Sequence, residues 1–103
     1  MQIVTKDQFL SEFTKGKVIV DFYAEWCGPC KAITPSLESL EKEYPSVKLV
    51  KINIDDVENM DLVTGFGVRS VPTLVALNDN QAVFQLVGGQ PKENLRKLFD
   101  ALQ

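Results

Sequence analysis

The chain has no histidine, only two cysteines and a single tryptophan among its 103 residues. Structural zinc normally takes four ligands from cysteine and histidine, so we expect no metal site. No hydrophobic run reaches membrane-spanning length, and residues 1–7 hold no apolar core long enough for a signal peptide. The net charge of −3, with scattered basic residues, gives no electrostatic support for nucleic-acid binding. We therefore expect a cytoplasmic protein that binds neither membranes nor nucleic acid.

The composition is that of an ordinary globular protein, with 45% hydrophobic and 24% charged residues. A chain of this length forms one domain, here residues 1–103, and buries enough apolar surface to fold without covalent staples. A disulfide between the two cysteines would close too short a loop to stabilise the fold much. In the reducing cytosol such a pair is more often catalytic or metal-binding than structural.

The hydrophobic pattern predicts alternating strands and helices. The predicted strands are a short edge strand at Ile3 and Val4 and the segments 18–23, 47–54, 73–77 and 82–87. The predicted helices are a short one from Thr5 to before Gly16, the segments 31–44 and 57–63, and a last helix opened by Pro91. Helices between the early strands imply parallel pairing, and the polar turn 78–81 joins the last two strands as an antiparallel hairpin. The predicted class is α/β, a central mixed sheet with helices on both faces.

Pro35 lies inside the predicted helix 31–44. Because proline removes a backbone donor, we expect it to kink this helix and to angle its first turn away from the remainder.

The two cysteines, Cys27 and Cys30, directly follow the most apolar predicted strand. Residues three apart at the start of a helix have Cα atoms about 5 Å apart, which suits a disulfide that opens and closes with little backbone movement. A strand feeding a helix that carries such a pair is typical of a redox centre. The alternatives are an inert disulfide or half of a zinc site, for which the other ligands are lacking.

Taken together, these segments resemble the thioredoxin family along essentially the whole chain. The matching pieces are Val20 to Lys31 with Trp26-Cys27-Gly28-Pro29-Cys30, then Pro35, Lys51-Ile52-Asn53-Ile54-Asp55, Val71-Pro72-Thr73 and Val87-Gly88. The resemblance implies the thioredoxin fold and a protein-disulfide reductase, a dithiol electron carrier in cell redox homeostasis. It also implies recharging by thioredoxin reductase, and oxidised clients such as peroxiredoxins, ribonucleotide reductase or methionine sulfoxide reductase. We expect a monomer with no bound cofactor, NADPH acting only through the reductase.

Cys27 is expected to attack, because the N–H groups of Gly28 and Cys30 and the helix dipole favour a thiolate there. The resemblance implies the same assignment, with Cys30 as the resolving thiol and Pro29 limiting the flexibility of the turn. The thiol pKa characteristic of this family is about 7, whereas that of a free cysteine is about 8.5. At neutral pH the lower pKa raises the thiolate fraction roughly 15-fold but lowers the nucleophilicity of the thiolate roughly 5-fold. The net gain of about threefold indicates that positioning and the second step matter more.

Asp21 is the one polar interruption in a buried strand, so its pKa is expected to be raised. By resemblance it accepts the proton of Cys30, directly or through a water. Lys51 falls on the equivalent part of the next strand, where it is expected to pair with Asp21. The alternatives are a satisfied structural carboxylate for Asp21 and a solvated strand lysine for Lys51.

Pro72 resembles the family's cis-proline, beside which the backbone of Val71 offers pairing to an extended client segment. The expected substrate-binding residues are Trp26, Gly28, Pro29, Val71, Pro72, Val87 and Gly88. Core packing for Val87 and a plain turn for Gly88 are the alternatives.

The sequence departs from the family pattern at Tyr23, where many members carry tryptophan, and at turn 78–81, which lacks the usual glycine. Two other functions stay open. An oxidase or isomerase of the same fold often has histidine in place of Pro29. A non-catalytic binding subunit would use the rim around Cys27 and would tolerate Cys27→Ser.

Overall fold

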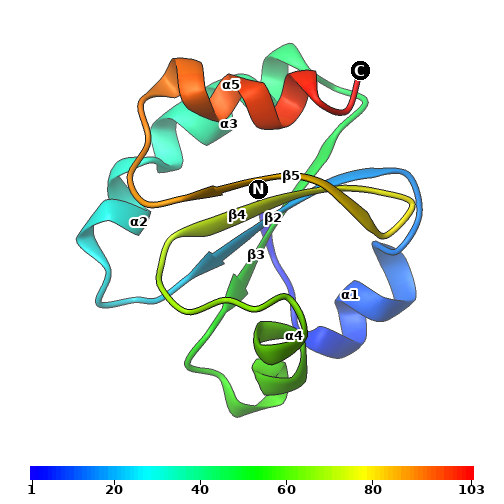
Figure 1. Ribbon diagram of the computed structural model, residues 1–103, viewed down its shortest axis with the longest axis vertical. Coiled ribbons are helices and arrows are strands. Elements are labelled where there is room, and N and C mark those ends of the chain that lie inside the picture. The colour runs from blue at the N-terminus through cyan, green and yellow to red at the C-terminus, as the bar shows by residue number, and fades with distance from the viewer.

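The computed structural model describes all 103 residues and contains one five-stranded sheet in the order β1-β3-β2-β4-β5 (Figure 1). The strands are β1 (Gln2–Ile3), β2 (Lys17–Tyr23), β3 (Lys48–Asn53), β4 (Thr73–Asn78) and β5 (Gln81–Val87). β3 pairs in parallel with β1 and β2, whereas β4 pairs antiparallel with β2 and β5. The predicted mixed sheet with a C-terminal hairpin is confirmed, and β2 is its central strand.

Helices cover both faces of the sheet, as predicted. They are α1 (Lys6–Glu12), α2 (Gly28–Ala32), α3 (Thr34–Glu43), the 3₁₀ turn η1 (Val57–Asn59), α4 (Met60–Gly65) and α5 (Lys92–Asp100). In Figure 1, α3 and α5 lie together on one side of the sheet, and α1 and α4 lie on the other. No helix combines the length and the apolar character needed to cross a membrane.

Side chains of β2 feed two separate cores because successive residues point to opposite faces of the sheet. Ile19 packs in a cluster of 12 buried residues under α3 and α5. Val18 and Val20 pack in a cluster of 10 buried residues with side chains of α1. Burial on both faces explains why this strand reads as a nearly continuous apolar run.

The helix predicted over residues 31–44 is two helices. α2 begins earlier, at Gly28, and the chain breaks at Ile33 before α3. Pro35 lies in the first turn of α3, where a helix needs no backbone donor, so it opens a new helix rather than kinking a continuous one. The first turn, which carries Cys30, is thereby separated from α3, as the proline was expected to ensure.

Two local predictions find their physical basis. Thr5 caps α1, its side chain accepting a hydrogen bond from the Gln8 backbone at 3.4 Å. The hairpin turn needs no glycine because Asp79 (φ 49°) and Asn80 (φ 66°) occupy the left-handed region, which short polar side chains tolerate. The helical spacing of Phe9, Leu10 and Phe13 predicts an apolar stripe on α1, but Leu10 does not join it because it is 48% exposed.

Candidate active site

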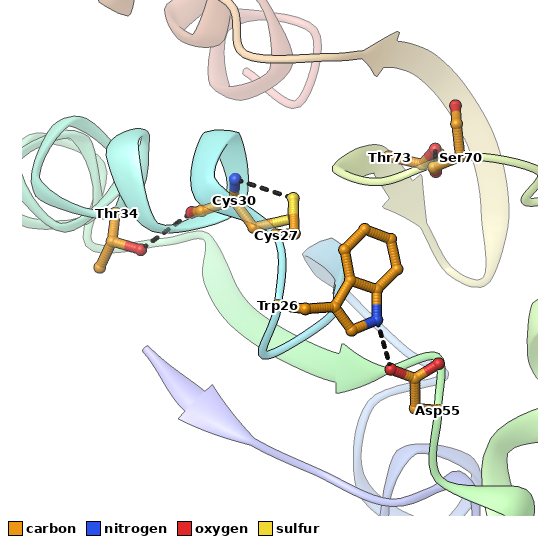
Figure 2. Close-up of a disulfide and its surroundings, with 7 residues drawn as sticks. All are labelled: Trp26, Cys27, Cys30, Thr34, Asp55, Ser70 and Thr73. Atoms are coloured by element: carbon orange, nitrogen blue, oxygen red, sulfur yellow. Dashed lines mark hydrogen bonds between the residues drawn. A yellow bond between two sulfur atoms is a disulfide. The ribbon is translucent and has the colours of Figure 1, made fainter.

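Cys27 and Cys30 lie where β2 leaves the sheet and α2 begins, and they are joined as a disulfide (Figure 2). Their Cα atoms are 5.3 Å apart, close to the spacing expected from the sequence. Cys27 is the N-cap residue of α2, and its Sγ accepts a hydrogen bond from the Cys30 backbone N–H at 3.1 Å. Of the two N–H groups expected to face this sulfur, that of Cys30 does and that of Gly28 does not.

Both cysteines are buried, Cys27 with 3% and Cys30 with 1% of its surface exposed. Burial is therefore nearly the same for the two sulfur-bearing residues. The position of Cys27 at the helix N-cap distinguishes them, because a thiolate is stabilised there and not within the turn. Both pack in a small cluster with Tyr23 and Ala24.

Asp21 is fully buried, and neither of its carboxylate oxygens is hydrogen-bonded to a protein group. Burial raises the pKa of Asp21 from its ordinary value of 3.8 to about 7, and the positive charge of Lys51 offsets part of this effect. The alternative of a satisfied structural carboxylate does not describe these contacts. The arrangement supplies a group that exchanges a proton near neutral pH.

Lys51 lies directly opposite Asp21 in the parallel register of β2 and β3. The two residues are neighbours in the sheet, but the expected ion pair between their side chains does not form. The Lys51 ammonium instead lies over the Tyr23 ring, 4.2 Å from its centroid. Its side chain is half-buried, which also distinguishes it from a freely solvated strand lysine.

The segment around Pro72 leads into β4, whose first residue pairs with Phe22 near the end of β2, and so lies close to the cysteines. The Val71–Pro72 peptide bond is cis, and Val71 packs against the small cluster that contains both cysteines. The Gly88 N–H donates to the Pro72 carbonyl at 2.8 Å, which ties the end of β5 to this segment. The Thr73 hydroxyl donates to the Ser70 carbonyl at 2.7 Å and closes the same loop (Figure 2).

The predicted rim presents exposed surface near the disulfide. Trp26 is 70% exposed and Val87 is 47% exposed, so core packing does not describe Val87. Gly28 and Pro29 are also exposed, whereas Pro72 is buried. The structure thus places the expected binding residues on the turn that opens α2, on the cis-proline loop and at the end of β5.

Two residues of this region were not predicted. Asp55 accepts a hydrogen bond from the Trp26 indole at 2.8 Å, and Figure 2 shows the indole reaching from the disulfide toward it. Asp55 lies in the segment Lys51-Ile52-Asn53-Ile54-Asp55, and the resemblance of this segment to the family is the feature of the sequence that could have indicated a role for Asp55. Gly89 approaches Pro29 so closely that a Cβ there would lie 3.3 Å from the proline Cβ, and nothing in the sequence indicates this.

Comparisons with known proteins agree with this geometry. The family model described as Thioredoxin matches residues 1–101. A thioredoxin from Chlamydia muridarum is 44% identical over 103 residues, covering 100% of this chain and 99% of that protein. A thioredoxin from Bacillus subtilis is 45% identical over 97 residues, covering 93% of this chain and 91% of that protein.

Solved structures show the same likeness. A mutant thioredoxin from Halobacterium salinarum superposes with a TM-score of 0.86 at 36% identity, covering 98% of this chain and 88% of that one. A thioredoxin from Plasmodium falciparum superposes with a TM-score of 0.89 at 32% identity, covering all of both chains.

Proposed function

The chain belongs to the thioredoxin family, and we propose that it is a general reductant of client disulfides that is recharged by a thioredoxin reductase. It is a thiol–disulfide oxidoreductase with protein-disulfide reductase activity, and Cys27 and Cys30 are its redox pair. The observation that carries the proposal is the disulfide at the N-cap of α2, with the Cys30 N–H on the Cys27 sulfur.

In the first step, the Cys27 thiolate attacks one sulfur of a client disulfide. A mixed disulfide forms between Cys27 and the client, and the second client sulfur leaves as a thiolate. The Cys30 N–H and the start of α2 stabilise the charge on Cys27 before the attack.

In the second step, Cys30 attacks the Cys27 sulfur of the mixed disulfide. The Cys30 thiol gives its proton to the Asp21 carboxylate, the Cys27–Cys30 disulfide forms, and the remaining client sulfur leaves as a thiolate. The raised pKa of Asp21 supports this role, because a proton acceptor works best when its pKa lies near the working pH. Lys51 contributes the nearby positive charge that keeps part of the carboxyl ionised.

The client is held by the rim around Cys27. We assign backbone pairing to Val71 beside Pro72, and apolar contact to Trp26 and Val87. Gly88, Gly28 and Pro29 let the client chain approach closely, since two of them carry no side chain and the third is compact. The exposure of Trp26 and Val87 next to a buried disulfide supports this assignment.

Residues 1–103 act as one thioredoxin domain, without a bound cofactor, and NADPH acts only through the reductase. The partners are that reductase and oxidised proteins such as peroxiredoxins, ribonucleotide reductase or methionine sulfoxide reductase. Action in the cytoplasm suits a strongly reducing dithiol. Family membership supports these assignments.

The direct test follows the reduction of a disulfide protein by NADPH and thioredoxin reductase, with and without this chain. We expect NADPH oxidation to depend on the chain and to vanish in Cys27→Ser. Full activity of Cys27→Ser would instead support a non-catalytic binding subunit. A redox potential near about −180 mV, rather than the family's characteristic value of about −270 mV, would favour an isomerase.

A further inference from the structure

We infer that Tyr23 is a positioning residue for the resolving step, because its ring holds the Lys51 ammonium to one side of the Asp21 carboxyl. The inference deepens the proposed function and rests on Asp21 as the proton acceptor for Cys30. Tyr23 packs in the small cluster with both cysteines but exchanges no proton or electron in this scheme, and it acts through the placement of Lys51.

The strand geometry brings the three side chains together. Asp21 and Tyr23 are two apart on β2, so they point to the same face of the sheet, and Lys51 is directly opposite Asp21 on β3. From this position Lys51 has two partners within reach, the carboxylate and the aromatic ring. The ammonium is over the ring at 4.2 Å, and the carboxylate keeps no ion pair and no hydrogen bond.

The ring face of Tyr23, and not its hydroxyl, makes this contact. The Tyr23 hydroxyl forms no hydrogen bond with a protein group, and the residue is buried. Burial, the negative charge of Glu25 and that of Asp21 together raise the pKa of Tyr23, so the phenol stays neutral wherever the enzyme works. A cation is attracted to the face of such a ring by its quadrupole.

Few charges other than that of Lys51 act on the Asp21 carboxyl. The titratable groups from the elements packed around it are Asp21 and Tyr23 of β2, Glu25 after β2, Lys51 of β3, and Cys27 and Cys30 at the start of α2. On the other side of Asp21, β4 presents Leu74, which carries no charge. Lys51 is therefore the one cation in position to pair with Asp21.

If the ring is removed, the buried and unpartnered Asp21 carboxylate becomes the strongest attraction for the Lys51 ammonium. A direct ion pair favours the charged carboxylate and lowers its pKa. Asp21 then holds the proton of Cys30 less strongly at neutral pH, so the resolving step slows.

The experiment titrates the Asp21 carboxyl by carbon-13 NMR in the oxidised protein, in which no cysteine titrates. We expect Tyr23→Leu to lower the pKa of Asp21 by about one unit, the small end of the effect of a close opposite charge. Tyr23→Phe, which keeps the ring, is expected to leave this pKa unchanged. An unchanged or raised pKa in Tyr23→Leu would overturn the inference.

A second pair of variants separates placement of Lys51 from a general packing defect. In a Lys51→Met background, Tyr23→Leu no longer has a cation to release, so we expect no fall in the pKa of Asp21. The same fall with and without Lys51 would show that Tyr23 acts through packing and would contradict the inference. If Tyr23→Leu fails to fold, Tyr23→Met is titrated in both backgrounds with the same expectation.

Kinetics distinguish failure of this inference from failure of the proposed function. If Asp21 is the proton acceptor, Tyr23→Leu slows client release several-fold at pH 7 and leaves the first attack unchanged. A lowered pKa of Asp21 without any change in release would show that Tyr23 positions Lys51 but that Asp21 is not the proton acceptor. Tyr23 would then have no role in the resolving step.

Discussion

The middle of β2 and its carboxyl end are consecutive parts of one strand, yet their environments are opposite. Around Ile19 and Val20, two clusters of 12 and 10 buried residues pack apolar side chains on both faces. At the end of the strand, the buried cluster has only four members, two of which are the disulfide cysteines, and the strand also carries a buried carboxylate without a partner. The middle supplies stability, whereas the end carries a buried, unpartnered carboxylate that costs stability and that we propose as the proton acceptor for Cys30.

The largest expected effects come from replacing the two cysteines that follow β2. Cys27→Ser is expected to abolish client reduction, whereas Cys30→Ser is expected to trap a mixed disulfide because the resolving thiol is missing. Non-reducing electrophoresis after incubation with an oxidised client shows the covalent adduct. An adduct with Cys27→Ser and none with Cys30→Ser would reverse the proposed order of attack.

Asp21→Asn tests whether the end of β2 lowers stability. Because burial raises the pKa of Asp21 from 3.8 to about 7, the folded state binds more protons than the unfolded state between these values. This contribution to stability is complete below about pH 4 and is lost as the pH rises through 7. The difference between the folded-state and unfolded-state pKa of Asp21 corresponds to about 4 kcal/mol. At pH 8, Asp21→Asn is therefore expected to be more stable than the wild type by up to that amount.

Denaturant unfolding of the oxidised protein at pH 4 and pH 8 measures this difference. The exposed Glu38 of α3 provides the control variant Glu38→Gln, which is expected to change stability little at either pH. A loss of stability in Asp21→Asn at pH 8 would mean that the carboxylate has a stabilising partner after all.

Leu37→Ala tests the other side of the comparison. Leu37 is fully buried in the larger cluster, and its truncation is expected to cost about 3 kcal/mol, mostly through the cavity left behind. Single-turnover rates of the folded variant are expected to keep the wild-type ratio between attack and release. A selective change in one step would show that this core cluster takes part in the chemistry.

Much of the difference between the middle and the carboxyl end of β2 could be predicted from the sequence. The apolar run that makes up β2, the helical stripe of α5 and the cysteine spacing are local patterns, and each has a direct physical meaning. The polar Asp21 inside the run was enough to predict a raised pKa, because burial follows from the strand's central position.

The remainder depends on contacts that local patterns do not encode. The register of β2 and β3 makes Lys51 a neighbour of Asp21, but the choice of the Tyr23 ring over the carboxylate depends on a side-chain conformation. The break at Ile33 is decided by where Pro35 is best tolerated, and two outcomes fit the same sequence. Pro72 was expected to be cis only through family resemblance, since most such bonds are trans.

Gly88→Ala is expected to change stability less than Asp21→Asn or Leu37→Ala. Gly88 has φ +92° and donates a hydrogen bond to Pro72, so alanine there costs about 1–2 kcal/mol of backbone strain. We expect weaker client binding, seen as a higher KM, with the rate of attack retained at saturation. Gly65→Ala is the matched control, because Gly65 has no left-handed backbone and open space around it. Equal effects of both substitutions would remove Gly88 from the binding rim.

The measurement that most directly tests the account compares the two steps of a single turnover in the wild type and in Asp21→Asn. Stopped-flow kinetics with a client disulfide at pH 7 resolve formation of the mixed disulfide from release of the reduced client. We predict that the substitution slows release at least about tenfold and changes the first attack little, because in the proposed mechanism only Cys30 passes its proton to Asp21. Equal slowing of both steps, or unchanged release, would contradict the claim that the buried carboxylate at the end of β2 serves the resolving thiol.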